Sequence, residues 1–109
     1  MVVSASVREI GPDAFCNCGK LTRVTFAPGS KLEVISAGSF RNSGVKSVEI
    51  PSGVTLIGGR AFEQCKELKS VSFAEGSRLE KLEKECFCGT GVEELEIPSS
   101  VTVMEEGAF

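Results

Sequence analysis

The sequence of 109 residues predicts a solenoid, in which short coils stack to form a parallel β-sheet on one face. Three observations predict it. A motif ending in phenylalanine recurs along the chain; its phenylalanines are 25, 22, 25 and 22 residues apart; and an alternating apolar and polar segment follows each of the first four. These anchors are Phe15, Phe40, Phe62, Phe87 and Phe109. Self-similarity at such a period is typical of solenoids. Because the spacing alternates, the true unit is a pair of repeats, 47 residues long.

The alternating segments are predicted to be the strands of the sheet. They carry apolar residues at positions 1, 4 and 6 and polar residues at positions 3 and 5, which indicates a strand with one buried face. The segments are residues 21–26 (LTRVTF), 45–50 (VKSVEI), 68–73 (LKSVSF) and 92–97 (VEELEI). Stacked in register, they predict four parallel strands. Pro51 and Pro98 directly follow a strand, where the missing N–H ends the hydrogen-bond ladder.

The rest of each repeat is predicted to form the other walls. The turn after the strand is short in two repeats (PSG, PSS) and two residues longer in the others (APGSK, AEGSR). An apolar pair such as Val54 and Ile57 then predicts a short second strand. Ile57, Ala61 and Phe62 are spaced as one face of a helical turn. Pro12 suits the first residue of such a turn, and we expect the glycines of "GGR" to relax its entry.

The chain is predicted to be one array, with a partial repeat at residues 1–15 and repeats at 16–40, 41–62, 63–87 and 88–109. A single repeat cannot bury its apolar face, so neighbouring repeats must supply the stability. Val3 aligns with Ile50, which indicates that the chain begins at the tail of a strand. Neither end carries a polar capping repeat. We therefore expect a segment of a longer solenoid, and end-to-end self-association when it is isolated.

Composition excludes several classes of function. The net charge of −3 argues against a general nucleic-acid surface, which needs a basic excess. The apolar runs are too short to insert into a membrane, and the start of the chain does not have the pattern of a signal peptide. Histidine is absent, which excludes nucleophiles paired with histidine and removes the commonest metal ligand. Compartment and localisation stay open at this point.

Five cysteines are the most conspicuous candidates for chemistry. Cys16 and Cys88 both follow an anchor phenylalanine but lie three coils apart, about 14 Å at the spacing of neighbouring strands. A shared metal site is therefore not expected. Cys18 and Cys65 occupy the same repeat position as a serine and a threonine, which favours small buried side chains bonded to carbonyl groups of the turn. The odd number argues against a disulfide framework, so we expect free thiols.

No catalytic or cofactor-binding constellation is apparent, and the chain is not expected to be an enzyme. Glu94 and Glu96 lie on one face of a strand, about 7 Å apart. A hydrolase using paired carboxylates would need a cleft, and a flat repeat face offers none, so a solvated strand surface is the favoured interpretation. The glycine-rich stretches GTGV and GGR lack the frame of a phosphate-binding loop.

The exposed face of the predicted sheet is the remaining candidate site. Strand positions 3 and 5 supply its side chains, which are Arg23, Thr25, Ser47, Glu49, Ser70, Ser72, Glu94 and Glu96. The face runs from slightly basic to acidic and carries no aromatic anchor of the kind that dominates many interfaces. It is therefore either a contact surface for a protein ligand or a coat of solubilising residues.

The repeats resemble a known family. The strand pattern is similar to the L-x-x-L-x-L of leucine-rich repeats, and "IPSGVTLIGGRAFEQCKEL" resembles the BspA-like, surface-antigen type. The resemblance runs from about Val3 to Phe109. It implies a leucine-rich-repeat solenoid and a role in adhesion or recognition at the cell surface. It carries no catalytic motif. We therefore expect a protein-recognition module, and the alternative is a structural spacer array with no ligand of its own.

Overall fold

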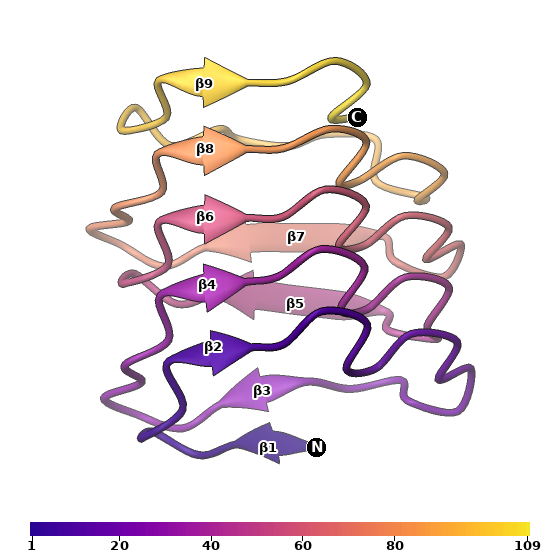
Figure 1. Ribbon diagram of the computed structural model, residues 1–109, viewed down its shortest axis with the longest axis horizontal. Helices are drawn as coiled ribbons and strands as arrows, with labels where there is room; N and C mark the ends of the chain where they lie inside the picture. The colour runs from indigo at the N-terminus through magenta and orange to yellow at the C-terminus, as the bar shows by residue number, and fades with distance from the viewer.

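Nine short strands, joined by turns, wind into a solenoid of coils stacked from the N-terminus to the C-terminus (Figure 1). The protein is described by a computed structural model of residues 1–109. The strands are β1 (Val2–Val3), β2 (Glu9–Ile10), β3 (Thr25–Phe26), β4 (Val34–Ile35), β5 (Ser47–Ile50), β6 (Leu56–Ile57), β7 (Ser70–Phe73), β8 (Lys81–Leu82) and β9 (Val103–Met104). No helix is long and apolar enough to cross a membrane.

The short second strands form the uninterrupted wall of the solenoid. β2, β4, β6, β8 and β9 make one parallel sheet in that order, in front in Figure 1. Ile10, Ile35, Ile57 and Leu82 occupy one register position across it, and all four are buried. The predicted apolar pairs therefore do build second strands. They form the longest sheet because each coil adds its pair at the same position.

The opposite wall corrects the prediction of four continuous parallel strands. β1 pairs with β3, and β5 pairs with β7, but no strand pairing joins β3 to β5. Residues 92–97 form no strand. The strands that form are also shorter than the alternating segments that predicted them. This wall therefore has two breaks, one between β3 and β5 and one after β7, and the breaks lie one 47-residue unit apart.

The expected helical turn before each anchor is not found, and a β-turn occupies its place. In the first copy the Ala14 N–H donates to the Gly11 carbonyl at 3.2 Å, and Asp13 has a φ of 55°. Pro12 thus occupies the second position of a turn whose third residue needs positive φ, the pattern of a type II turn. The later copies place positive φ at Gly38, Arg60, Glu85 and Gly107. A left-handed residue there prevents the helix from propagating.

The core is a set of ladders that run along the solenoid axis. The anchor rings stack in sequence with centroids 5.2–5.8 Å apart, so that Phe40, Phe62 and Phe87 each lie between two rings. Val48, Ile50 and Val71 of the divided wall are buried and point toward the same interior. The expectation that neighbouring repeats bury one another's apolar faces is confirmed, and the buried side chains form the ladders. They do not need a continuous sheet, because side chains pack across the places where the backbones separate.

The first and last coils expose apolar side chains. Met1 and Val2 at one end, and Val103, Met104 and Phe109 at the other, are between 42% and 69% exposed. In the middle of the array the side chains equivalent to Met104 and Phe109, such as Ile57 and Phe62, are buried by neighbouring coils. End-to-end self-association of the isolated chain stays a prediction.

Candidate functional site

All eight side chains predicted for the exposed sheet face are exposed to solvent. On the paired strands β5 and β7, Ser47 lies beside Ser70 and Glu49 lies beside Ser72. The other four are Arg23 and Thr25 in the coil before this pair, and Glu94 and Glu96 in the coil after it. The structure therefore gathers the eight on one wall but in three groups.

Two clefts separate these groups. The lower cleft lies between residues 23–30 and residues 47–52 and has a volume of about 500 Å³. The upper cleft lies between residues 71–77 and residues 94–99 and has a volume of about 590 Å³. Both volumes fall in the range of ligand pockets in proteins, about 300–1,000 Å³. The expectation of a flat repeat face was wrong.

Backbone hydrogen bonds close each cleft at its two ends. At the upper cleft the Gly91 N–H donates to the Leu68 carbonyl, and the Thr102 N–H donates to the Glu80 carbonyl, both at 2.9 Å. At the lower cleft the Lys46 N–H donates to the Thr22 carbonyl at 3.1 Å, and Thr55 closes the far end. No backbone hydrogen bond crosses either cleft between these ends. The two openings are therefore equivalent features, one 47-residue unit apart.

The prolines give a physical reason for the clefts. After β7 the ladder continues, because the Ala74 N–H donates to the Ile50 carbonyl of the preceding coil at 3.0 Å. In the next coil the equivalent residue is Pro98, which has no N–H to donate toward Phe73. Pro51 has the same relation to Phe26 in the lower cleft. The longer turns are also bonded to the coil on the side away from the cleft. The Arg78 N–H, in the turn after β7, donates to the Ser52 carbonyl of the preceding coil at 2.9 Å.

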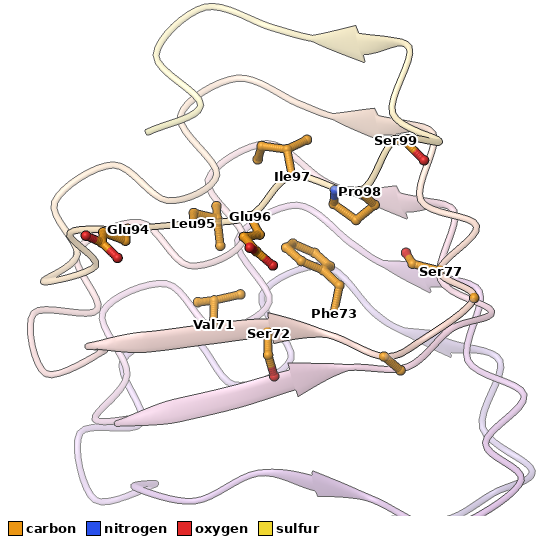
Figure 2. A pocket seen from close by; sticks show the side chains of 12 residues that line it. Val71, Ser72, Phe73, Ser77, Glu94, Leu95, Glu96, Ile97, Pro98 and Ser99 are labelled. Atoms are coloured by element: carbon orange, nitrogen blue, oxygen red, sulfur yellow. The ribbon is translucent and has the colours of Figure 1, made fainter.

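The upper cleft is lined by acidic, hydroxyl and apolar groups (Figure 2). Phe73 lies on its β7 side and is half-buried, and Ser72 and Ser77 come from the same coil. From the opposite side, the Glu96 side chain points toward β7, next to the ring of Phe73 in the view, while Glu94 lies farther along the cleft. These groups present hydrogen-bond acceptors on both sides of one opening.

Neither carboxylate of the upper cleft has a charged partner. The ion pairs of the protein involve other glutamates, such as Glu63, which lies 3.0 Å from Arg41. No ion pair within 4.0 Å involves Glu94 or Glu96. None of the residues that line the upper cleft is basic. The lower cleft differs, because Arg23 lines it together with Glu49.

The upper cleft does not have the arrangement of a hydrolase site that uses paired carboxylates. Such a site holds one carboxyl group in a buried environment and the other in a solvated one, so that they act as acid and base. Glu94 and Glu96 are both exposed. The cleft therefore offers two solvated anions, which suits binding better than acid–base chemistry.

The cysteines are unpaired, as the sequence predicted. The Cys65 thiol donates to the Phe40 carbonyl of the preceding coil at 2.9 Å and is buried. The equivalent Thr90 hydroxyl donates to the Phe87 carbonyl at 3.0 Å, but Thr90 and Cys18 are only half-buried, and the Ser43 hydroxyl bonds to the Cys65 sulfur. The expected buried bonds to carbonyl groups are therefore found in part. Burial raises the pKa of Cys65, and burial raises the pKa of Cys86 to about 12. Both buried thiols therefore stay protonated at neutral pH.

We expect alkylation to distinguish two classes of thiol. At pH 8 in the folded protein, iodoacetamide should modify the half-buried Cys16, Cys18 and Cys88 and spare Cys65 and Cys86, because the thiolate is the nucleophile. After denaturation without reductant, mass spectrometry should count all five cysteines as modified. Rapid modification of Cys86 in the folded protein would contradict its burial, and a denatured count of one would indicate two disulfides.

A family model for the BspA type leucine rich repeat region matches residues 1–109, in six copies. The chain belongs to the BspA-type leucine-rich-repeat family. No curated protein matches it. Two solved structures show what this BspA-type array is similar to. One is the pneumococcal vaccine antigen PcpA, with 29% identity and a TM-score of 0.91. The other is a leucine rich cell surface protein from Faecalibacterium prausnitzii A2-165, with 26% identity and a TM-score of 0.70.

The BspA-type array spans only part of each of these relatives. The PcpA match covers 94% of this chain and 25% of that protein, and the second match covers 99% of this chain and 35% of that protein. The likeness therefore establishes the leucine-rich-repeat architecture across this chain. The functions of the complete relatives therefore belong to proteins several times longer than this chain.

Sequence reasoning missed the residues that form the clefts. Phe26 and Phe73 appeared only as core positions, and Pro51 and Pro98 only as the ends of strands. The signal was present in the sequence, because a proline and a short turn recur 47 residues apart, each after a repeat with a longer turn. That alternation marks which neighbouring coils separate in this BspA-type array.

The two cleft glutamates are expected to contribute little to folding. Replacing Glu94 or Glu96 by glutamine should change the free energy of unfolding by less than about 0.5 kcal/mol, because both are exposed and neither makes an ion pair. Urea denaturation of each variant checks this. A larger loss from Glu94→Gln than from a core substitution would show that the faces of this segment are assigned wrongly.

Proposed function

We propose that this BspA-type array is a non-enzymatic protein-recognition module that binds a protein through the divided wall, meaning the wall formed by β3, β5, β7 and residues 92–97. One observation carries the proposal. The divided wall repeats an opening at the 47-residue period, and exposed polar side chains surround each opening. Arg23, Thr25, Ser47, Glu49, Ser70, Ser72, Glu94 and Glu96 are the candidate contact residues. Solenoids commonly bind partners on such extended surfaces.

The similar structures support a place at the cell surface. One is described as a vaccine antigen and the other as a cell surface protein. An adhesion or surface-antigen role for the parent of this chain is consistent with both. Within such a parent, this array contributes a stretch of binding wall rather than a catalytic centre. A spacer that only carries other domains would need no clefts.

The test compares one substitution on two walls. Ser70→Arg places a long side chain at the centre of the divided wall and outside both clefts. Val103→Arg places the same side chain on β9 of the opposite wall, where Val103 is exposed. Proteins selected for binding to the array from a displayed library of extracellular domains supply the ligands, and surface plasmon resonance measures their affinities.

Recognition through the divided wall predicts that Ser70→Arg weakens binding at least about tenfold, or about 1.4 kcal/mol, and that Val103→Arg leaves it unchanged. Circular dichroism confirms that both variants are folded. If no protein is selected, or if both variants bind as the parent does, the array is better explained as a spacer.

A further inference from the structure

This inference rests on the proposed function and names the partner chemistry for one part of the divided wall. We propose that the upper cleft binds an extended peptide segment of a partner that carries arginine at alternate positions. The segment pairs its backbone with residues 93–97 and directs its guanidinium groups at Glu94 and Glu96.

The backbone of residues 93–97 is open for pairing. None of its N–H or C=O groups makes a backbone hydrogen bond in the protein. The bonds on either side show where the open stretch ends: the Val92 N–H donates to the Thr90 hydroxyl, and the Val101 N–H donates to the Pro98 carbonyl. Unpaired backbone groups of this kind are a ready template for a strand, and many domains bind peptides by such addition.

The segment already has the side-chain pattern of a strand. Leu95 and Ile97 are half-buried against the core, while Glu94 and Glu96 are exposed. Because the interior side is occupied by packing, an added peptide would find its backbone partner in place and would not need the segment to refold. Its alternate residues would lie beside Glu94 and Glu96 at the distance of cross-strand neighbours, about 4.5–5.5 Å between Cβ atoms.

The side chains of the cleft select a cation with many donors. The carboxylates only accept hydrogen bonds, and the serine hydroxyls can accept as well as donate. No basic residue lines the upper cleft itself, and Lys69 lines the adjoining hollow together with Glu94. Arginine has five N–H donors and no acceptor, and its planar group also stacks on aromatic rings. The half-buried ring of Phe73 also lines the cleft. Arginine therefore matches this cleft better than lysine, which has a compact charge and three donors.

The lower cleft serves as an internal control for the charge of the upper cleft. It has the same construction and a similar volume, but Arg23 lines it, and the position equivalent to Glu94 is Ser47. Its single glutamate, Glu49, thus shares the cleft with a guanidinium group. The Lys46 N–H there is also already bonded to Thr22. An arginine-bearing segment is therefore expected to prefer the upper cleft.

The experiment measures the binding of two labelled hexapeptides, Ser-Arg-Val-Arg-Val-Ser and Ser-Glu-Val-Glu-Val-Ser, both with blocked ends. Fluorescence anisotropy should detect binding of the arginine peptide only. The double variant E94Q/E96Q should weaken it by roughly two- to thirtyfold, since two opposite-charge cross-strand pairs are lost. The E49Q variant should bind as the parent does.

Raising salt from about 0.01 M to about 1 M should weaken binding, because the Debye length falls from about 30 Å to about 3 Å.

Amide hydrogen exchange locates the peptide. Exchange of the amides of residues 93–97 should slow when the arginine peptide binds the parent chain, and should not slow in the double variant. Equal binding of the two peptides would overturn the proposal. An unchanged affinity in E94Q/E96Q, an equal loss in E49Q, or protection only outside residues 93–97 would also overturn it.

The two proposals fail differently. If the arginine peptide does not bind but Ser70→Arg still abolishes binding of a selected protein, the cleft proposal fails and recognition through the divided wall stands. If both tests are negative, recognition fails as well. Folding is expected to be unchanged in the glutamine variants, because the replaced glutamates are exposed and make no ion pair. A loss of binding can therefore be attributed to the lost charges.

Discussion

Replacing Phe62 by alanine is expected to cost about 3–5 kcal/mol of unfolding free energy, the usual range for a buried phenylalanine. Phe62 is 1% exposed and lies between the rings of Phe40 and Phe87, with centroids 5.2 Å and 5.3 Å away. Its removal leaves a cavity in the middle coil. The backbone cannot collapse into it easily, because the Phe62 N–H is bonded to Cys86 of the next coil at 2.8 Å.

Phe109→Ala is the matched control for Phe62→Ala. Phe109 belongs to the same stack but is 51% exposed and contacts one ring, at 5.8 Å. Denaturant unfolding followed by circular dichroism should show a much smaller loss for Phe109→Ala. Equal losses in the two variants would mean that the stack does not stabilise the array in proportion to burial.

Gly58→Ala is the second change with a large expected effect, about 1–3 kcal/mol of destabilisation from overpacking. A Cβ atom at Gly58 would lie 2.5 Å from the Ala37 backbone nitrogen and 2.8 Å from the Ser36 carbonyl carbon. Those are backbone atoms of the preceding coil, so the two coils would have to separate. The glycine therefore permits close approach of two coils. The positive φ of this turn belongs to Arg60 instead, which corrects the expectation that the glycine pair relaxes the entry.

The control for this substitution lies at the equivalent position of the first coil. A Cβ atom at Gly11 has no atom within 4 Å. Gly11→Ala should therefore leave the melting temperature nearly unchanged or raise it slightly, since alanine restricts the unfolded chain. Thermal melts of the two variants test the pair. A Gly58→Ala variant as stable as Gly11→Ala would show that the coils are not in close contact at this turn.

Much of the fold could be predicted because each coil repeats the same buried pattern. The recurrence of the anchor phenylalanines predicted the stacked coils, and the apolar pairs predicted the second strands. The alternating segments correctly predicted which side chains face solvent on the divided wall, including Glu94 and Glu96. Side-chain direction follows from the two-residue period of an extended chain, and it does not require the hydrogen bonds of a sheet.

The helical turn was predicted wrongly because spacing alone does not determine backbone conformation. An i, i+4, i+5 pattern of apolar residues fits a helix, but the same side chains reach the core from a β-turn. Asp13, Arg60 and Glu85 adopt positive φ there although they are not glycine. Aspartate is among the residues that adopt this conformation more often, but arginine and glutamate give little local signal. Hydrogen bonds from one coil to the next hold them in it.

The sequence by itself determined the solenoid, its 47-residue unit, the buried ladders and the polar side chains of one wall, because these depend on periodicity and on the burial of apolar groups. Only the tertiary structure decided which neighbouring backbones pair on that wall. On this wall a strand can pair with the coil before it or the coil after it. Which pairing forms depends on where a proline lacks its N–H and on which neighbouring coil the longer turn is bonded to. Those effects act between residues 20 or more positions apart, and they turned an expected flat sheet into two clefts.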